Sequence, residues 1–70
     1  MKVKINGEST TVSNFQIVPH AKKLTYIFWG CFDCYLHDQS FTFEVSHDGK
    51  LLYIGSGKVT SVSCSYLIVE

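Results

Sequence analysis

The chain lacks the features that mark a disordered, secreted or membrane-spanning protein. It has one proline, and 46% of its residues are hydrophobic, a composition that excludes disorder. No basic stretch followed by a continuous apolar run opens the sequence, so we expect no signal peptide. No apolar run is long enough to span a bilayer. We therefore expect a cytoplasmic protein that begins at its own methionine and has no membrane partner.

An excess of charge is also missing. Six basic residues balance six acidic ones, so the formal net charge at pH 7 is zero. Binding to the phosphate backbone of a nucleic acid normally needs an extended basic surface, and this composition does not supply one. The charge balance disfavours nucleic acid as the principal partner.

The chain is short, and its cysteines are few. Its 70 residues form a single domain over residues 1–70, and a domain of this size buries only about 60% of the surface that its unfolded chain exposes. Disulfides, a metal or oligomerisation usually supplement so small a core. Three cysteines are an odd number, which argues against a closed disulfide framework.

The clearest structural signal lies between Ser40 and Ile54. Phe41, Phe43 and Val45 alternate with polar residues, and a second apolar run follows the Asp48-Gly49 pair. Alternation with period two is typical of a half-buried strand, because successive side chains point to opposite faces. Asp-Gly tolerates the positive φ that a type I′ turn requires. The segment therefore predicts an antiparallel hairpin.

A second hairpin is expected at the N-terminus. Val3 and Ile5 alternate with lysines and lead into Asn6-Gly7. The apolar phase of the return strand slips between Val12 and Phe15, which a bulge near residues 13–14 would correct. Pro19 is expected to end the strand, with a turn at residues 20–23.

The remaining segments complete an all-β pattern. Residues 24–29 form a strand that is apolar on both faces, Gly55-Ser56-Gly57 is interpreted as a turn, and residues 58–69 as the last strand. We find no helical period. We predict a small antiparallel barrel or sandwich of five to six short strands built from hairpins.

Several strands carry more apolar surface than one core can cover. In the 40–54 hairpin, Leu52 and Ile54 are expected on the inner face with Phe43 and Val45, which leaves Leu51 and Tyr53 outside. Ile27 and Trp29 oppose Leu24, Tyr26 and Phe28, and Tyr66 and Ile68 oppose Leu67 and Val69. Antiparallel sheets normally leave one face polar. The excess therefore favours self-association, as a homo-oligomer, or a protein partner.

One constellation resembles a metal or redox site. Cys31, Cys34, His37 and Cys64 could supply four zinc ligands, although the turn-tolerant residues of a zinc knuckle are absent around Cys34. A redox dithiol normally needs a helix N-terminus, and none is predicted. One disulfide between two of the three cysteines is a further alternative. The interpretation that we prefer is that all three thiols are small buried hydrophobic groups, with no metal and no cofactor.

No catalytic arrangement is recognisable. His20, His37 and His47 fall in or near turns, where exposed histidines are common, and His37 and Asp38 should point apart if the backbone is extended. The carboxylates Asp33, Asp38 and Glu44 form no pair. The Gly55-Ser56-Gly57 segment lacks the lysine and helix of a phosphate loop. We therefore expect no catalytic residues and no enzyme activity.

The function that this pattern favours is that of a small, non-enzymatic protein-interaction module. By analogy of size and composition alone, this describes an inhibitor or assembly factor of the kind that phages and mobile elements encode. Contact residues are expected among the exposed aromatic and aliphatic side chains Ile27, Trp29, Phe32, Tyr35 and Tyr53. The alternatives are a zinc-stabilised small β domain and a binder of single-stranded nucleic acid or glycan that uses aromatic side chains as a stacking platform.

Overall fold

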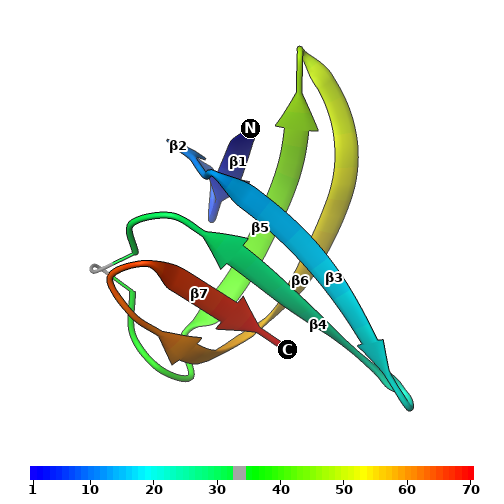
Figure 1. Ribbon diagram of the computed structural model, residues 1–70, viewed down its shortest axis with the longest axis vertical. Coiled ribbons are helices and arrows are strands. Elements are labelled where there is room, and N and C mark those ends of the chain that lie inside the picture. Colours follow the sequence, from blue (N-terminus) through cyan, green and yellow to red (C-terminus); the bar gives the residue numbers. More distant parts are fainter. Residues whose placement is uncertain (33–34) are drawn as a thin grey trace.

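The protein is described here by a computed structural model, which covers residues 1–32 and 35–70 (Figure 1). These residues form seven β-strands and no helix. The all-β class and the assembly from hairpins are confirmed, although the strands number seven rather than five or six. The strands are β1 (Lys2–Ile5), β2 (Glu8–Thr11), β3 (Asn14–His20), β4 (Lys23–Trp29), β5 (Ser40–His47), β6 (Lys50–Val62) and β7 (Tyr66–Val69).

All seven strands belong to one antiparallel sheet with the order β2-β1-β5-β6-β7-β4-β3. The thirteen-residue β6 pairs with β5 along its first part and with β7 along its last part, so the sheet folds over at this strand. Figure 1 shows β3, β4 and β7 in front of β1 and β5. Within the described residues the terminal strands β2 and β3 do not pair, so the sheet stays open and a barrel or sandwich is not confirmed.

Both predicted hairpin turns are present. Asn6 and Gly7 have φ values of 50° and 89°, and Asp48 and Gly49 have 52° and 78°. A type I′ turn requires positive φ at both central residues, which Asn, Asp and Gly adopt at the least steric cost. Both turns are therefore predicted correctly from the local sequence.

The N-terminal return strand differs from the prediction. Instead of one bulged strand, β2 ends at Thr11 and β3 begins at Asn14, and the chain passes from one half of the sheet to the other between them. The Val12 N–H donates to the Met1 carbonyl, and the Ser13 N–H donates to the Trp29 carbonyl. These two hydrogen bonds attach residues 12 and 13, where the chain crosses over, to both halves of the sheet.

Pro19 does not end its strand as expected. β3 continues to His20, with Pro19 opposite Leu24, and the turn consists of Ala21 and Lys22. β3 lies at the end of the sheet, and an edge strand tolerates the missing N–H of proline on its unpaired side.

The prediction of a turn at Gly55-Ser56-Gly57 is wrong, because all three residues lie within β6. A Cβ atom added at Gly55 would lie 2.6 Å from Cζ of Phe43, and one added at Gly57 would lie 2.5 Å from the carbonyl oxygen of Glu70. The glycines are therefore needed for close packing where β6 bends, and not for chain reversal.

The last predicted strand is in fact parts of two strands. β6 ends at Val62 and β7 starts at Tyr66, with a turn between them in which Ser63 Oγ accepts hydrogen bonds from the Ser65 and Tyr66 N–H groups. Cys64 lies in this turn and is exposed, although residues 58–69 were predicted to form one strand and the Cys64 thiol to be buried.

The 40–54 hairpin has its second strand inverted relative to the prediction. A bulge between Val45 and Ser46 places Tyr53, rather than Leu52, opposite Val45. One extra residue exchanges the two faces of a strand. Leu52 and Ile54 are consequently 59% and 63% exposed, while Tyr53 packs against the core.

The core lies between the two halves of the folded sheet and is dominated by aromatic rings. The ring centroids of Phe28 on β4 and Phe43 on β5 are 4.9 Å apart in an edge-on arrangement, which joins the halves. Among the described residues, the following twelve hydrophobic ones are buried: Val3, Ile5, Val12, Tyr26, Phe28, Phe32, Phe41, Phe43, Val45, Val59, Leu67 and Val69.

Candidate protein-interaction surface

Five apolar side chains gather on the outer surface of β3, β4 and β7. Cross-strand partners share a face of the sheet. Ile27 pairs with Ile68 and Trp29 pairs with Tyr66, and all four point away from the buried Phe28, Leu67 and Val69. We call the following set the outer apolar face: Val18, Ile27, Trp29, Tyr66 and Ile68.

The members of this face remain partly open to solvent. Trp29 and Val18 are 38% and 42% exposed, and Ile27, Tyr66 and Ile68 are half-buried. The Trp29 and Tyr66 rings contact each other with centroids 5.9 Å apart. The two aromatic side chains thus support each other at a fixed place on the sheet.

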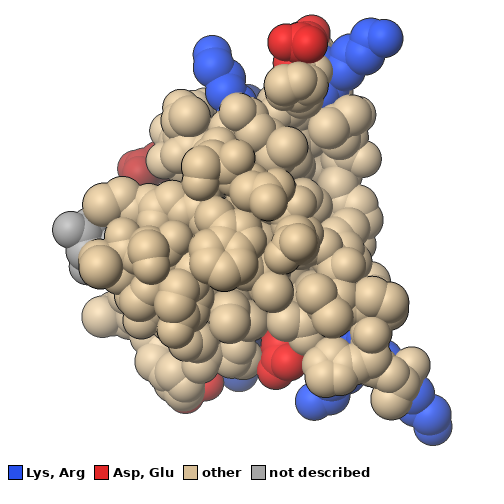
Figure 2. Space-filling model, in the orientation of Figure 1, with Lys and Arg blue, Asp and Glu red and all other residues tan. Residues whose placement is uncertain are grey.

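Charge is confined to the rim of this side of the molecule. Figure 2 shows the broad face over β3, β4 and β7 with lysine and acidic side chains only at its edges. An uncharged centre that contains Trp and Tyr, surrounded by a polar rim, is the composition found in the cores of protein–protein interfaces. The outer apolar face is therefore the best candidate for a functional surface.

Two of the predicted contact residues lie on this face. Ile27 and Trp29 occupy the same side of β4, as the alternation in residues 24–29 indicated. Tyr53 lies elsewhere: it packs half-buried against the core, and its hydroxyl is 2.9 Å from that of Tyr26. The structure therefore separates Tyr53 from the other two.

The predicted aromatic loop turns inward. Phe32 is 1% exposed and belongs to the core, so the prediction that it is available for contact is wrong. Tyr35 is half-buried, with its ring 5.9 Å from that of Phe32 and 5.8 Å from that of Phe41. Both residues cover the end of the core after β4 has ended at Trp29, which sequence alternation alone could not reveal.

Tyr66, Ile68 and Val18 were missed as contact residues. A signal for the first two was present, because Tyr66 and Ile68 alternate with the buried Leu67 and Val69. Their proximity to Trp29 depends on the pairing of β4 with β7, which joins residues about 40 positions apart in the sequence. No local pattern predicts that pairing.

The structure describes only part of the predicted zinc-ligand set of Cys31, Cys34, His37 and Cys64. Cys31 and Cys64 are free and exposed, so the interpretation of these two thiols as buried hydrophobic groups is wrong. Cys34 and Asp33 lie outside the described residues. Within residues 1–32 and 35–70 no three His, Cys, Asp or Glu side chains are grouped as a metal ion requires.

The three histidines are exposed, as predicted. His37 and Asp38 do not point apart, because the positive φ of 64° at Asp38 brings its Oδ2 within 3.3 Å of His37 Nδ1. Both side chains are more than 60% exposed, and a pair so open to water adds little to stability.

No family model, curated protein or solved structure matches this chain. The described residues contain no helix that is long and apolar enough to cross a membrane. The surfaces of the molecule itself therefore provide the basis for a functional proposal.

Proposed function

We propose that this protein is a non-enzymatic protein-interaction module, an inhibitor or assembly factor, that binds a protein partner or a second copy of itself through the outer apolar face. The observation that supports this most directly is the joining of Trp29, Tyr66, Ile27 and Ile68 into one uncharged surface by two neighbouring strands. A cytoplasmic location belongs to the same proposal. For the fold, we infer a sandwich rather than a barrel, because two sheet halves face each other across the Phe28–Phe43 contact.

The side of the molecule that carries the outer apolar face is large enough for a stable interface. The molecule measures 30 × 27 × 19 Å, so its broadest side has an area of about 800 Å², comparable to what each partner buries in a standard-size complex. Burial of apolar surface contributes about 25 cal/mol per Å², of which association consumes a large part. Trp and Tyr at the centre are the residue types that most often dominate such contacts.

Site-specific photo-crosslinking tests the proposal. A benzophenone amino acid at position 27 should give cross-linked species in the cells that express the protein, since Ile27 lies within the face. The matched control carries the same group in place of Glu44, which is exposed on the other half of the sheet. Equal cross-linking from the two positions, or none from position 27, would contradict the proposal.

Sedimentation separates self-association from binding to another protein. A homo-oligomer should sediment faster as its concentration rises, and Trp29→Ala should abolish this increase while the protein remains folded. A monomer that cross-links only through position 27 indicates a different protein as partner.

A second function has one observation in its favour. Trp29 and Tyr66 are adjacent aromatic residues on an exposed sheet surface, as in proteins that stack bases or sugar rings. Their planes are inclined at 59°, so they do not form one flat platform. Titration with oligothymidine and with oligosaccharides, followed by Trp fluorescence, tests this candidate.

A further inference from the structure

A cleft on a different part of the molecule has the features of a second binding site. It lies between the projecting end of the β3–β4 hairpin and the bend of β6, and its volume is about 570 Å³. Lys22 and Lys23 line it from the hairpin, and Ser56 and Lys58 line it from β6. The cleft thus contains three of the six basic residues of the chain.

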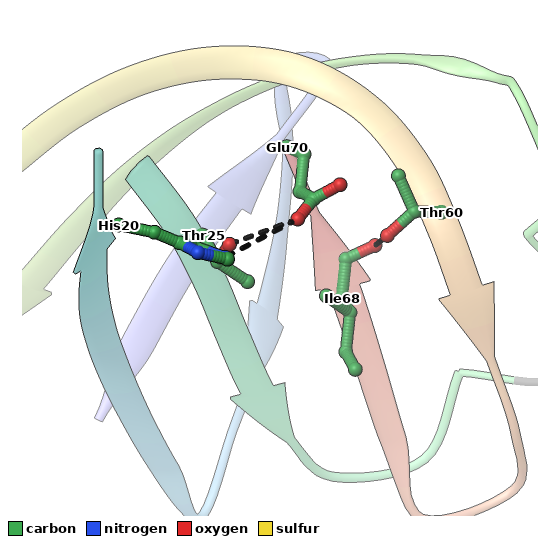
Figure 3. A network of polar contacts seen from close by, with 5 residues as sticks. All are labelled: His20, Thr25, Thr60, Ile68 and Glu70. Carbon is green, nitrogen blue, oxygen red and sulfur yellow. Dashed lines mark hydrogen bonds and ion pairs between the residues drawn. The ribbon is translucent and has the colours of Figure 1, made fainter. Parts of the chain in front are cut away.

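The two carboxylates in this cleft already have partners. Glu70 Oε2 accepts a 3.0 Å hydrogen bond from the buried Thr25 hydroxyl and lies 3.9 Å from His20 Nε2 (Figure 3). Asp38 is 3.3 Å from His37. None of the three lysines forms an ion pair with a carboxylate in the described part of the chain. The side chains that line the cleft carry three positive charges and two negative ones, and the three lysine ammonium groups, which have no carboxylate partner there, are available to an anionic ligand.

One wall of the cleft is apolar and uncovered. Leu24 and Tyr26 line the cleft from the inward-facing side of β4. Ile17 is not part of this lining but lies beside it, opposite Tyr26 on β3. Ile17 and Leu24 are nevertheless 39% and 41% exposed, because the hairpin extends beyond the opposite half of the sheet. Inward-facing side chains without a covering layer form a surface on which the apolar side chains of a ligand can pack.

The adjacent part of β6 has a free backbone edge. Residues 51–57 pair with β5 on one side, and among the described residues no strand pairs with them on the other. The unpaired N–H and C=O groups of such an edge can accept a further strand.

Within the described part of the sheet, the free edge on β6 is less protected than the outer edges of β2 and β3. β3 carries Pro19, and β2 has only four residues, the first of them Glu8. Residues 51–57 contain neither proline nor a charged residue, and the bulge at residues 51–53 is the one edge-blocking feature that they carry.

We propose that an extended acidic segment of a partner protein binds in this cleft and adds a strand to the free edge of β6. Its backbone pairs with residues 51–57, its apolar side chains pack on Ile17 and Leu24, and its carboxylates lie near Lys22, Lys23 and Lys58. This site is separate from the outer apolar face and does not depend on it.

NMR with a defined peptide tests the proposal. The acetylated and amidated octapeptide EVTVEVTE should shift the amide resonances of residues 51–57 in ¹H–¹⁵N spectra of the full chain. The double variant Lys22→Gln, Lys58→Gln should weaken binding about fivefold to tenfold, since each exposed charge contact contributes a modest amount. The control variant Lys2→Gln, Lys4→Gln makes the same change in net charge far from the cleft and should bind normally, as should Trp29→Ala.

Four results would overturn the proposal. The first is equal or tighter binding of the charge-reversed peptide KVTVKVTK, and the second is a set of amide shifts confined to the outer apolar face. The third is binding of an eight-nucleotide oligothymidine at the lysines in place of the peptide. The fourth is a concentration-dependent shift of the residue 51–57 amides without any peptide. The last result would show that a second copy of the chain occupies the edge. Backbone N-methylation of EVTVEVTE at alternate residues should abolish binding, because it removes the donors that strand addition needs.

Discussion

The ring of Phe43 occupies the space in which any side chain at Gly55 would have to lie. The two residues are cross-strand partners on β5 and β6, and an added Cβ would lie 2.6 Å from Cζ of the ring. Because Phe43 is 2% exposed and surrounded by other rings, it has no free space into which to move. We expect Gly55→Ala to lower the free energy of unfolding by about 1–3 kcal/mol, as overpacked cores do. Urea denaturation measures this.

The neighbouring exposed residue supplies the control for that experiment. Ser56→Ala changes a solvent-facing side chain on the same strand and should stay within about 0.5 kcal/mol of the wild type. If Gly55→Ala were as stable as Ser56→Ala, the close packing of Phe43 on Gly55 would be wrong.

Truncation of two adjacent residues on β4 should lower the free energy of unfolding by very different amounts. Phe28 is fully buried and contacts the rings of Phe15, Phe41 and Phe43, so Phe28→Ala should cost about 3–5 kcal/mol and leave much of a small domain unfolded. Trp29→Ala, on the outer apolar face, should change stability by about 1 kcal/mol or less. Thermal unfolding, monitored by circular dichroism, compares the stabilities of the two variants. Similar losses of stability would mean that the two faces of β4 are wrongly assigned.

The paired hydroxyls of Tyr26 and Tyr53 predict a loss of stability at alkaline pH. The hydrogen bond with Tyr53, and then burial, raise the pKa of the Tyr26 hydroxyl above its ordinary value of about 10. The unfolded chain therefore loses this proton first, so the contribution to stability is complete below pH 10 and is lost as pH rises through the folded-state pKa.

Removal of the Tyr53 hydroxyl tests this coupling. Tyr53→Phe should cost about 0.5–1.5 kcal/mol at pH 8, and its deficit relative to the wild type should shrink between pH 10 and pH 11. Urea midpoints measured at each pH give the comparison. Tyr66→Phe, which removes a tyrosine hydroxyl outside the core, is the matched control. A deficit for Tyr53→Phe that grows above pH 10 would reverse the sign of the predicted coupling.

Asn6 and Asp48 hold equivalent positions in two type I′ turns, but they should contribute different amounts to the stability of the fold. The Asn6 Oδ1 atom accepts hydrogen bonds from the N–H and hydroxyl of Thr42, at 3.0 and 3.1 Å, and its backbone N–H donates to the Thr42 carbonyl. For the Asp48 side chain, the one polar contact with another described residue is with His47, at 3.5 Å. Asn6→Ala should therefore cost about 1–2 kcal/mol more than Asp48→Ala in urea denaturation. Equal costs would show that the bonds to Thr42 add nothing beyond turn propensity.

The local signals in the sequence were sufficient for some of the fold. Alternation around Phe41, Phe43 and Val45 predicted the buried face of β5, and the Asn-Gly and Asp-Gly pairs predicted both hairpins. These features depend on the backbone preferences of two or three residues and on the period of a single strand, so no distant partner is needed to specify them. Ile27 and Trp29 were placed on one face for the same reason.

Other positions were undetermined until the strands were paired. Gly55-Ser56-Gly57 is compatible with a turn as well as a bend, and only the Phe43 ring and the Glu70 carbonyl beside these glycines select the bend. The bulge at Val45 and Ser46, which exchanged Leu52 and Tyr53 between faces, has no signature in the alternation of residues 50–54 and is seen only in the register of β5 with β6. The sequence by itself determined the two hairpin turns and the buried face of β5, whose energetics are local. Tertiary structure alone decided which apolar side chains stay exposed, because burial depends on contacts between residues that lie far apart along the chain.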